Sequence, residues 1–465
     1  FSGDDAVIAE ELDRLTADYL DQEVTLSDLQ EAVDKITAYC RSQGYAAASA
    51  FLPPQQITDG QVEVRIFLGK LGQVKIDNQS RLADSKAQAF AAPLPVGGYL
   101  RGKTAETVLN NLNDLPGIAA AGVLHPGSGI GETDLTITLA DTKQTETMLY
   151  ADNYGGSYSG RYRYGFQTTF DDLGRSGDKL YLGGMLTNGD THNYNVGYET
   201  AVGSRGSRLG VSYSLMDYSL GDYFNILDAV GKARTFSIYG STPLINSGGD
   251  YLAAVYGYAN RQLQDEMRLF GFSTKNPSNA LNAGISGRSR RSGSYTGYSA
   301  LYYWGQLTNE DFTGAGEGSF QKFTTDVSHL RRLGKSVDLQ LNFHGQLGSK
   351  ELDSSEQFYL GGANGAYPQG EAGGDGGYQA TAELRCHTPV PNLTLAAYTD
   401  WGEVYNHSGV DPHRNLAGWG VGVQYAESGS YYLRLDYARK INSQPYQGEE
   451  HDKNGRLWFQ AVKIF

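Results

Sequence analysis

The sequence predicts a transmembrane β-barrel of 16 antiparallel strands, preceded by two small α+β units. Three observations lead to this fold class. The 465-residue chain carries 33 Tyr and 60 Gly, and Tyr is favoured both in strands and at membrane–water interfaces. After residue 141, apolar and polar residues alternate over most of the chain, as in strands between lipid and a wet lumen. No run approaches the roughly 18 apolar residues that a membrane-spanning helix needs.

The composition also excludes several classes of protein. A net charge of −14 argues against nucleic-acid binding, because contact with phosphates requires a basic surface. The two cysteines, Cys40 and Cys386, fall in different predicted units and are expected to be unpaired thiols. No signal peptide is visible at Phe1. Since a barrel protein has to be exported, we interpret the sequence as a mature form or a fragment of one.

The first unit is assigned to residues 1–70. One helix face is marked by apolar residues three or four apart, namely Leu26, Leu29, Val33, Ile36 and Cys40. Ser27 and Gln30 have the spacing of a capping box, and Gly44 is a predicted C-terminal stop. An earlier helix is expected over 5–20. A strand follows the second helix, in which apolar residues alternate with Glu63, Arg65 and Phe67; these apolar residues are Val62, Val64, Ile66 and Leu68.

The second unit is assigned to residues 71–141. A strand begins at Val74, helical segments cover 86–91 and 104–112, and apolar residues alternate again over 135–139. The order of helices and strands in the first unit thus recurs in the second, although few residues are identical between the two. A single α+β domain of 140 residues is the alternative interpretation.

Residues 142–465 are assigned to the barrel. Val337 and Leu339, for example, alternate with Asp338 and Gln340. Such segments start near residues 145, 161, 176, 191, 206, 229, 250, 278, 294, 318, 335, 376, 392, 416, 430 and 455. The spacing averages about 20 residues, of which a membrane strand takes roughly 9–11. A soluble sandwich or β-helix would have turns nearer 8–12 residues apart, so the spacing favours a membrane barrel.

The end of the chain and its longest gap support the same interpretation. The last segment is itself a strand that closes on the aromatic residue Phe465. In lipid a final strand has to pair with the first, because an open edge would leave backbone groups unsatisfied. The longest gap, about 349–375, lies between the eleventh and twelfth segments.

Motifs along the chain then point to a known family. They are Gly44-Tyr45 followed by Phe51-Leu52-Pro53-Pro54-Gln55 and Gly60, the segment 109–131, the segment 150–156, the loop 358–371, the Tyr398, Asp400 and Gly402 motif, and the segments 416–422 and 433–439. In this order they resemble the outer-membrane transporters of two-partner secretion, the TpsB family. The resemblance covers nearly the whole chain, and it implies two periplasmic POTRA modules and a 16-stranded barrel.

The resemblance also implies a function. The POTRA modules would capture the N-terminal secretion domain of one large exoprotein, which threads the barrel unfolded and forms a β-helix outside without ATP. The other expected partners are outer-membrane lipids, and a monomer is expected, with no nucleic acid, cofactor, metal or catalytic residue. Capture by β-augmentation needs a free sheet edge. We take the strand 61–68, with Val62, Val64 and Ile66, as the candidate edge; an internal strand paired on both sides is equally compatible.

Two departures from the family pattern are visible. The sixth loop of the family carries an Arg that reaches the Asp of the thirteenth-strand motif inside the lumen. Here the loop motif is Asn364, Gly365, Ala366, Tyr367 and Pro368, without an arginine. Asp400 would then be a buried carboxylate short of its partner, which is costly, and a looser loop is expected. The family also begins with a plug helix and a linker, whereas Phe1 falls near the end of the first POTRA strand.

Three rival functions remain to be compared. The related barrel-assembly insertase also combines POTRA modules with a barrel, but typically carries more than two of them. A passive porin would not need the periplasmic units. An enzyme is disfavoured because the sequence has no nucleophile elbow, phosphate loop or histidine pair at metal-ligand spacing.

Overall fold

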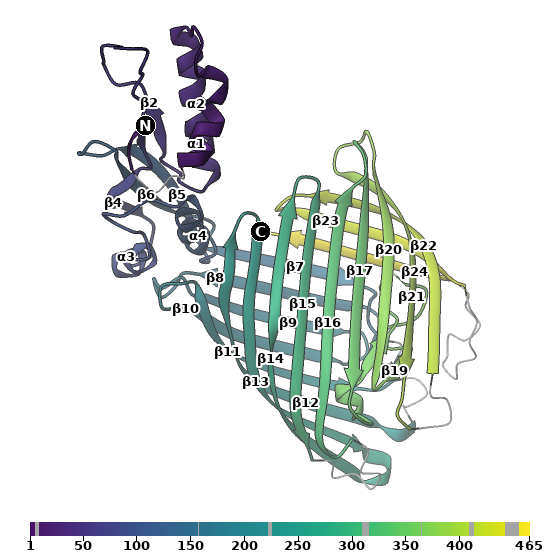
Figure 1. The fold of residues 1–465 in the computed structure, drawn as a ribbon. Coiled ribbons are helices and arrows are strands. Elements are labelled where there is room, and N and C mark those ends of the chain that lie inside the picture. The colour runs from purple at the N-terminus through teal and green to yellow at the C-terminus, as the bar shows by residue number, and fades with distance from the viewer. Residues whose placement is uncertain are drawn as a thin grey trace.

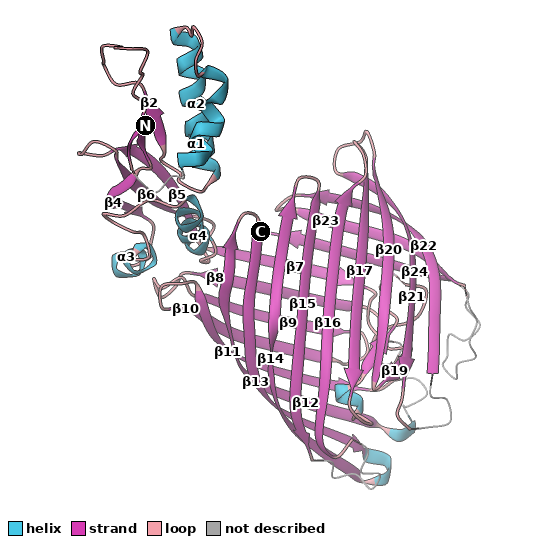
Figure 2. Cartoon of the chain, in the orientation of Figure 1, coloured by secondary structure: helices cyan, strands magenta, loops and turns pink. Residues whose placement is uncertain are grey.

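The computed structural model describes residues 1–4, 9–156, 158–221, 226–308, 316–363, 365–408, 413–441 and 455–465. Two small α+β units lie one after the other at one end of a closed β-barrel (Figure 1). The α-helices belong to the small units, whereas the barrel wall is made of strands and its connections include short 3₁₀ turns at the far end (Figure 2). None of the helices in the described part of the chain combines the length and the apolarity of a membrane-spanning helix.

The first unit packs two helices on a three-stranded sheet. Its elements are β1 (Ser2–Gly3), α1 (Ala9–Thr16), a 3₁₀ turn (Ala17–Tyr19), α2 (Leu26–Ser42), β2 (Ser49–Phe51) and β3 (Arg65–Phe67). The predicted apolar face of α2 buries Val33, Ile36 and Cys40. Burial raises the pKa of the Cys40 thiol. Cys40 and Cys386 are both free thiols, as expected.

The beginning of α2 differs from its prediction, while its end agrees with it. The capping box is formed by Thr25 and Asp28 and not by Ser27 and Gln30: the Thr25 amide donates to the Asp28 carboxylate at 2.7 Å, and the Asp28 amide donates to the Thr25 hydroxyl at 3.2 Å. The cap therefore lies two residues before the predicted one, and the helix starts at Leu26. Gly44 follows the last turn with φ +92°, where glycine is favoured. In the helix expected over 5–20, residues 5–8 lie outside the described residues.

The predicted free edge of the first sheet is wrong. The strand order is β1-β3-β2, so β3 is the central strand. Ile66 pairs with Gly3 on one side and with Ala50 on the other. Upstream, the Val64 carbonyl accepts from the Ser2 amide at 3.0 Å. Of the predicted strand 61–68, only Arg65–Phe67 forms a strand, and it is internal because β1 at the N-terminus covers the side that was expected to be open; Val62 and Val64 precede it outside the strand.

The second unit has a sheet of order β4-β6-β5 with two helices against it. The elements are β4 (Lys70–Gln79), α3 (Asp84–Ala91), α4 (Gly102–Asn113), β5 (Ile118–Pro126) and β6 (Glu132–Asp141). Phe90, Leu112, Ile137 and Leu139 are almost fully buried between helices and sheet. Because β6 lies in the middle, β4 and β5 form the two edges of this sheet.

The barrel closes with 16 strands in the described part of the chain, as the sequence predicts. They are β7 (Thr145–Asp152), β8 (Arg163–Asp171), β9 (Lys179–Thr187), β10 (His192–Val202), β11 (Ser207–Ser219), β12 (Ala229–Ser247), β13 (Asp250–Met267), β14 (Phe272–Arg291), β15 (Ser294–Leu307), β16 (Gly318–Arg332), β17 (Val337–Gly348), β20 (Gly376–His387), β21 (Leu393–Tyr405), β22 (His413–Glu427), β23 (Tyr431–Lys440) and β24 (Gly455–Ile464). Their outer faces expose apolar and aromatic side chains such as Val211, Tyr213, Phe236 and Trp304.

The barrel closes at a short seam between β24 and β7. The register there runs only from Met148 paired with Ile464 to Asp152 paired with Gln460. Asn153 extends the seam by one residue: its side chain donates to the Leu457 carbonyl at 2.8 Å and accepts from the Phe459 amide at 2.8 Å. The segment 150–156, which resembles a family motif, therefore has a structural role in closing the barrel.

The second unit is fixed to the near end of the barrel through β12. The Asn246 side chain donates to Asn111 at 2.9 Å and to Asp114 at 2.8 Å, and the Asn246 backbone carbonyl accepts from the Asn110 side chain at 3.0 Å. Arg288 on β14 also binds Asp114, with 3.0 Å between the charged groups. These contacts hold α4 across the ends of neighbouring strands.

We predict that Asn153→Ala weakens the seam. The substitution leaves two backbone groups without their amide partner, which costs about 1–3 kcal/mol. The temperature at which the folded barrel converts to its slower-migrating form on SDS gels should fall. Asn195→Ala is the control, because among the described residues that amide makes a single long contact, 3.5 Å to Asn193. Equal transition temperatures for the two variants would contradict the role given to Asn153.

Candidate functional site

The candidate site is the long connection between β17 and β20, together with the lumenal wall that it touches. Within this connection lie a 3₁₀ turn (Ser354–Glu356) and a small hairpin of β18 (Phe358–Leu360) and β19 (Ala372–Gly374). It follows the eleventh barrel strand, where the sequence places its longest gap. We call residues 349–375 the sixth loop.

One part of the sixth loop is held by the wall formed by β13, β14 and β16. Glu356, which is only 5% exposed, binds Arg261 and Lys322, each at 2.8 Å. Asp353 accepts a hydrogen bond from Asn276 at 3.3 Å. Two cations around one buried carboxylate compensate its desolvation, so this contact can hold the loop in place.

The end of the loop is organised by Asp375. This carboxylate is fully buried and accepts from the Leu352 amide at 2.8 Å and from the His407 amide at 2.7 Å. It therefore joins the first residues of the loop to the segment after β21. Carboxylates that accept backbone N–H groups form strong hydrogen bonds.

The tip of the loop lies against the opposite part of the wall, on β21–β24. Ala366 and Tyr367 are 1% and 2% exposed. The indole N–H of Trp458, on β24, donates to the carbonyl of Gly365 at 2.7 Å. Tyr154 packs edge-on against the same indole, with 5.8 Å between ring centroids. The Lys440 ammonium lies 5.0 Å from the centre of the Tyr367 ring.

Glycines let the tip reach the wall. On β22 Gly418 pairs with Asp400, and a Cβ at 418 would lie 2.6 Å from the Ala366 Cβ and 2.8 Å from Asp400 Oδ1. On β21 a Cβ at Gly402 would lie 2.6 Å from Leu360 of the loop. On the loop itself, a Cβ at Gly365 would lie 2.9 Å from Asp400 Oδ2. The backbones approach this closely only because no side chain intervenes.

Asp400 is buried beneath the tip, and its Oδ1 has no hydrogen-bond partner among the described residues. The structure thus brings together Asp400, Gly402, Gly365, Ala366 and Tyr367, as the family resemblance implies. Asn364 lies outside the described residues. Pro368 is half-buried, with its carbonyl against Gly361. The Trp458 indole holds the tip through the Gly365 carbonyl and does not reach Asp400, which keeps no cationic partner among the described residues. Although a looser loop was expected, Ala366 and Tyr367 are buried.

A charged network lies on the same inner wall, next to the tip. Arg434, on β23, binds Asp436 at 2.8 Å and Glu383, on β20, at 2.9 Å. All three side chains are buried. Gly422 makes room between the strands, because a Cβ there would overlap Asp436 Oδ1. The network ties β20 to β23 across the lumenal surface of the two strands between them.

Several residues of the site were not singled out from the sequence. Trp458 lies on the inward face of the last strand, opposite to the apolar outward series that the alternation identifies. Glu356, Arg261 and Lys322 come together over large sequence separations, which no local pattern reveals. In the described ranges, no group of three or more His, Cys, Asp or Glu side chains is arranged to hold a metal ion.

Comparison with known families gives two matches. The model "Haemolysin secretion/activation protein ShlB/FhaC/HecB" matches residues 131–425, and the model "POTRA domain, ShlB-type" matches residues 1–69. The first covers more than half of the chain.

Individual relatives agree with these matches. The chain is 28% identical to the heme/hemopexin transporter protein HuxB of Haemophilus influenzae, over 99% of this chain and 85% of HuxB. It is 24% identical to the outer membrane transporter CdiB of Dickeya dadantii, over 89% and 76%. Among solved structures, CdiB from Escherichia coli has a TM-score of 0.77 at 18% identity, covering 100% of this chain and 89% of that one. BamA from Haemophilus ducreyi has 0.59 at 16%, covering 100% and 99%.

We predict that Gly418→Ala displaces the loop tip. The added methyl group would overlap Ala366 and Asp400, and overpacking of this kind costs about 1–3 kcal/mol. Trp458 should become accessible to iodide, whereas Trp304, Trp401 and Trp419 face outward and stay shielded by detergent. The control is Gly297→Ala, where the nearest side chain is 3.8 Å from the new Cβ. Equal quenching in both variants would contradict the packing argument.

Proposed function

Because the chain belongs to the ShlB/FhaC/HecB family of haemolysin secretion/activation proteins, we propose that its sixth loop closes the lumen until an unfolded client enters. The protein is an outer-membrane transporter of two-partner secretion, with POTRA domains in the periplasm. The proposal rests on one observation: the loop contacts β13, β14 and β16 through Asp353 and Glu356, and β21–β24 through its tip. A chain that threads the barrel has to displace one of these contacts.

We propose that the tip is the contact that is released. The tip is held mainly by neutral contacts, among them the Trp458 hydrogen bond and apolar packing, and further along the loop Glu371 makes one ion pair with Arg414 at 3.3 Å; Glu356, by contrast, is held by two cations at 2.8 Å each. Removing a partner from a buried charge is more costly than breaking a neutral hydrogen bond. The uncompensated carboxylate of Asp400 also lowers the cost of tip release, because it regains water when the tip leaves.

For client capture we propose the outer edge of β5. The other edge of this strand pairs with β6. At the start of β5 the Asn113 side chain satisfies the Ala120 amide at 2.8 Å and its carbonyl at 2.9 Å. Beyond it, Val123 and Leu124 are 52% and 41% exposed. An extended client segment can add to such an edge through backbone hydrogen bonds, which suit a chain that slides onward.

The nature of the client is inferred from the family. We propose a large exoprotein that folds as a β-helix outside, since folding beyond the membrane can drive export without ATP. Relatives named heme/hemopexin transporter proteins favour a client that serves heme acquisition. We further propose boundaries at residues 70 and 141 between the units, a monomer surrounded by outer-membrane lipids, and no catalytic step. The family match favours secretion over the insertase reading, and BamA shares the fold alone.

We predict that Trp458→Phe opens the pore. The ring is kept and the donor to Gly365 is lost, which costs about 1–3 kcal/mol and should raise the open time about tenfold or more. Conductance of single barrels in planar bilayers measures this, and secretion of the client into the medium measures transport. Trp419→Phe is the control, because that indole is 41% exposed on the outer face. If both variants conduct like the parent, the tip is not the gate.

We predict that Leu124→Pro weakens capture. Alternate residues of an antiparallel strand direct their N–H and C=O groups to the same side, so Leu124, four residues after Ala120, presents its amide at the free edge. Proline removes this donor and is tolerated on edge strands. Binding of the client's N-terminal domain to the full chain should weaken about fivefold or more, since a hydrogen bond of about 1 kcal/mol is lost. Leu124→Ala keeps the donor and should weaken binding much less; equal losses for the two variants would mean that the side chain, and not the strand edge, binds the client.

A further inference from the structure

The extracellular ends of β11–β14 carry polar residues on the outer face of the barrel. Paired residues of neighbouring strands share a face, so the exposed residues Ile238, Tyr258 and Leu281 define one outward row. Arg234 and Lys232 lie four and six residues before Ile238 on β12, and the even spacing puts them on the same outer face. This end is extracellular, because the opposite end of β12 holds the POTRA unit.

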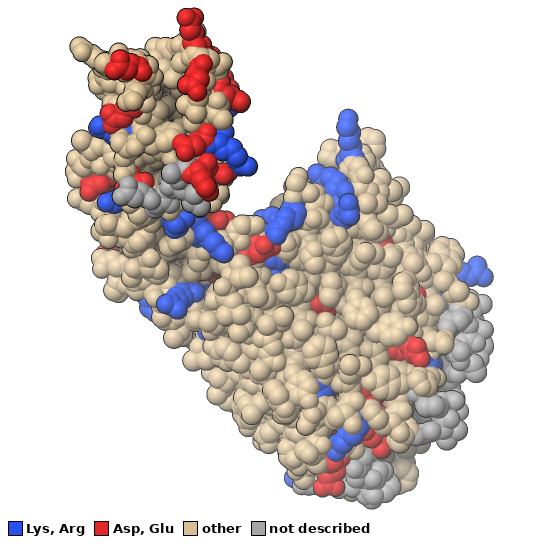
Figure 3. Space-filling model, viewed as in Figure 1, with Lys and Arg blue, Asp and Glu red and all other residues tan. Residues whose placement is uncertain are grey.

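The outward rows change chemistry abruptly beyond the apolar band. After the row of Ile238, Tyr258 and Leu281 come Phe236, Asn260 and Asn279. The next row is Arg234, Gln262 and Pro277, and the one after it is Lys232, Gln264 and Lys275. Each row adds about 7 Å along the strand. On β12 the cations therefore start about 7 Å beyond Phe236, the apolar residue that precedes them on the outer face. In Figure 3 the visible barrel wall has few charged side chains, and they become frequent again at its far end.

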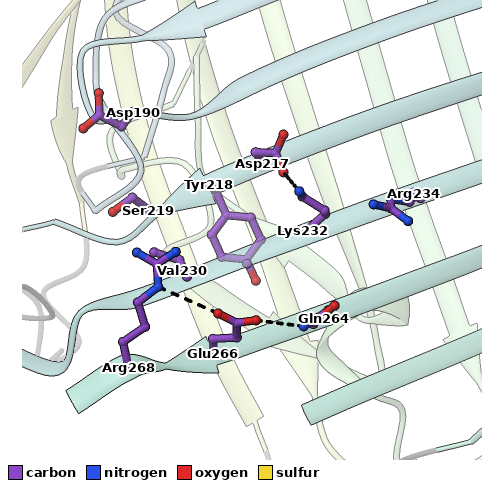
Figure 4. Close-up of a pocket in the computed structure, with 11 residues that line it drawn as sticks. Asp190, Asp217, Tyr218, Ser219, Val230, Lys232, Arg234, Gln264, Glu266 and Arg268 are labelled. Atoms are coloured by element: carbon purple, nitrogen blue, oxygen red, sulfur yellow. Dashed lines mark hydrogen bonds and ion pairs between the residues drawn. The ribbon is translucent and has the colours of Figure 1, made fainter. Parts of the chain in front are cut away.

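Two hollows are formed at this level. One, of about 350 Å³, is lined by Lys232, Arg234, Lys275 and the glutamines Gln262 and Gln264. The other, of about 400 Å³, lies further out and includes Asp217, Glu266 and Arg268. Figure 4 shows Lys232 and Arg234 side by side on β12, with Asp217 on one flank and Gln264 on the other.

The inner hollow has excess positive charge. Lys232 is paired with Asp217 at 3.1 Å, and Glu266 contacts Arg268 and Gln264. Arg234 and Lys275 are exposed, and neither makes an ion pair or hydrogen bond within the described ranges. Three basic groups and two amides around one hollow suit a phosphorylated sugar, because guanidinium and ammonium groups bind phosphate and amides bind hydroxyls.

We propose that this hollow binds the phosphorylated glucosamine headgroup of the lipopolysaccharide in the outer leaflet. Its acyl chains would lie along the outward apolar row below, against Phe236 and Ile238, while the phosphate meets Arg234 and Lys275. The charge, the height above the apolar band and the outward direction all match an anionic glycolipid. The lumen, through which the client passes, lies on the other face of these strands.

The test compares Arg234→Gln/Lys275→Gln with Arg331→Gln/Lys335→Gln. The second double variant removes the same charge from exposed residues at the periplasmic end of the barrel. The full chain is refolded in detergent free of lipopolysaccharide, and binding of bisphosphorylated lipid A is measured by native mass spectrometry. Folding of each variant is checked by the mobility shift on SDS gels. We expect affinity to fall about tenfold or more in the first double variant only, because charge-assisted hydrogen bonds to phosphate are lost.

Two further lipids test whether the hollow recognises the phosphates of lipid A in particular. Dephosphorylated lipid A should bind the parent and the first double variant equally. The affinity for phosphatidylglycerol should be nearly the same in that variant as in the parent. The proposal is overturned if both double variants lose lipid A equally, if dephosphorylated lipid A distinguishes parent from variant, or if phosphatidylglycerol loses as much as lipid A. The assay uses no client, so its outcome is independent of the gate and of client capture.

Discussion

Closure of the barrel is the constraint on which the rest of the molecule depends. In a hydrocarbon environment every backbone N–H and C=O group has to be satisfied within the protein, so a spanning sheet can have no open edge. The last strand, β24, therefore returns to β7, although their shared register is short. Asn153 lengthens the closure through its side-chain amide. Because the wall is closed, its inner face becomes a lumen that a loop can enter, and its outer face becomes a surface for lipid.

The inner wall of the barrel has room for the folded loop where glycines replace inward side chains. On β22, inward glycines alternate with outward Trp419 and Val421, so that the lipid face stays apolar while the lumenal face stays flat. Asp400 and the tip of the sixth loop occupy the space that side chains at Gly418 and Gly365 would fill. The loop is held against β13 and β16 by a carboxylate between two cations, and against β21–β24 by packing, the Trp458 hydrogen bond and one ion pair from Arg414 to Glu371. These contacts differ in how readily they are broken.

The sequence predicted the barrel well because its signal is periodic and repeated. Lipid on one face and water on the other require alternation in every strand. The predicted segment starts fall within three residues of the observed strand starts, except at β14, which begins at Phe272 and not near 278. The short N-terminal strand that covers β3 left no such signal, so the edge of the first sheet was placed wrongly. Within the site, the resemblance of the motifs to the family predicted that the sixth loop, with Tyr367, lies against Asp400. Trp458 could not be singled out, because one inward indole does not alter the outward pattern around it.

The 19-residue strand β12 has a mechanical consequence. Its periplasmic end holds α4 through Asn246, and beyond a register shift at Leu244 it continues to the opposite rim, paired along almost its whole length with β13. Five strands, β7–β11, separate it from the seam. A pull exerted on the second POTRA unit by an arriving polypeptide is thus transmitted as shear along long ladders. Since many hydrogen bonds in parallel bear a shear load, the tension is kept away from the short closure at β24 and β7.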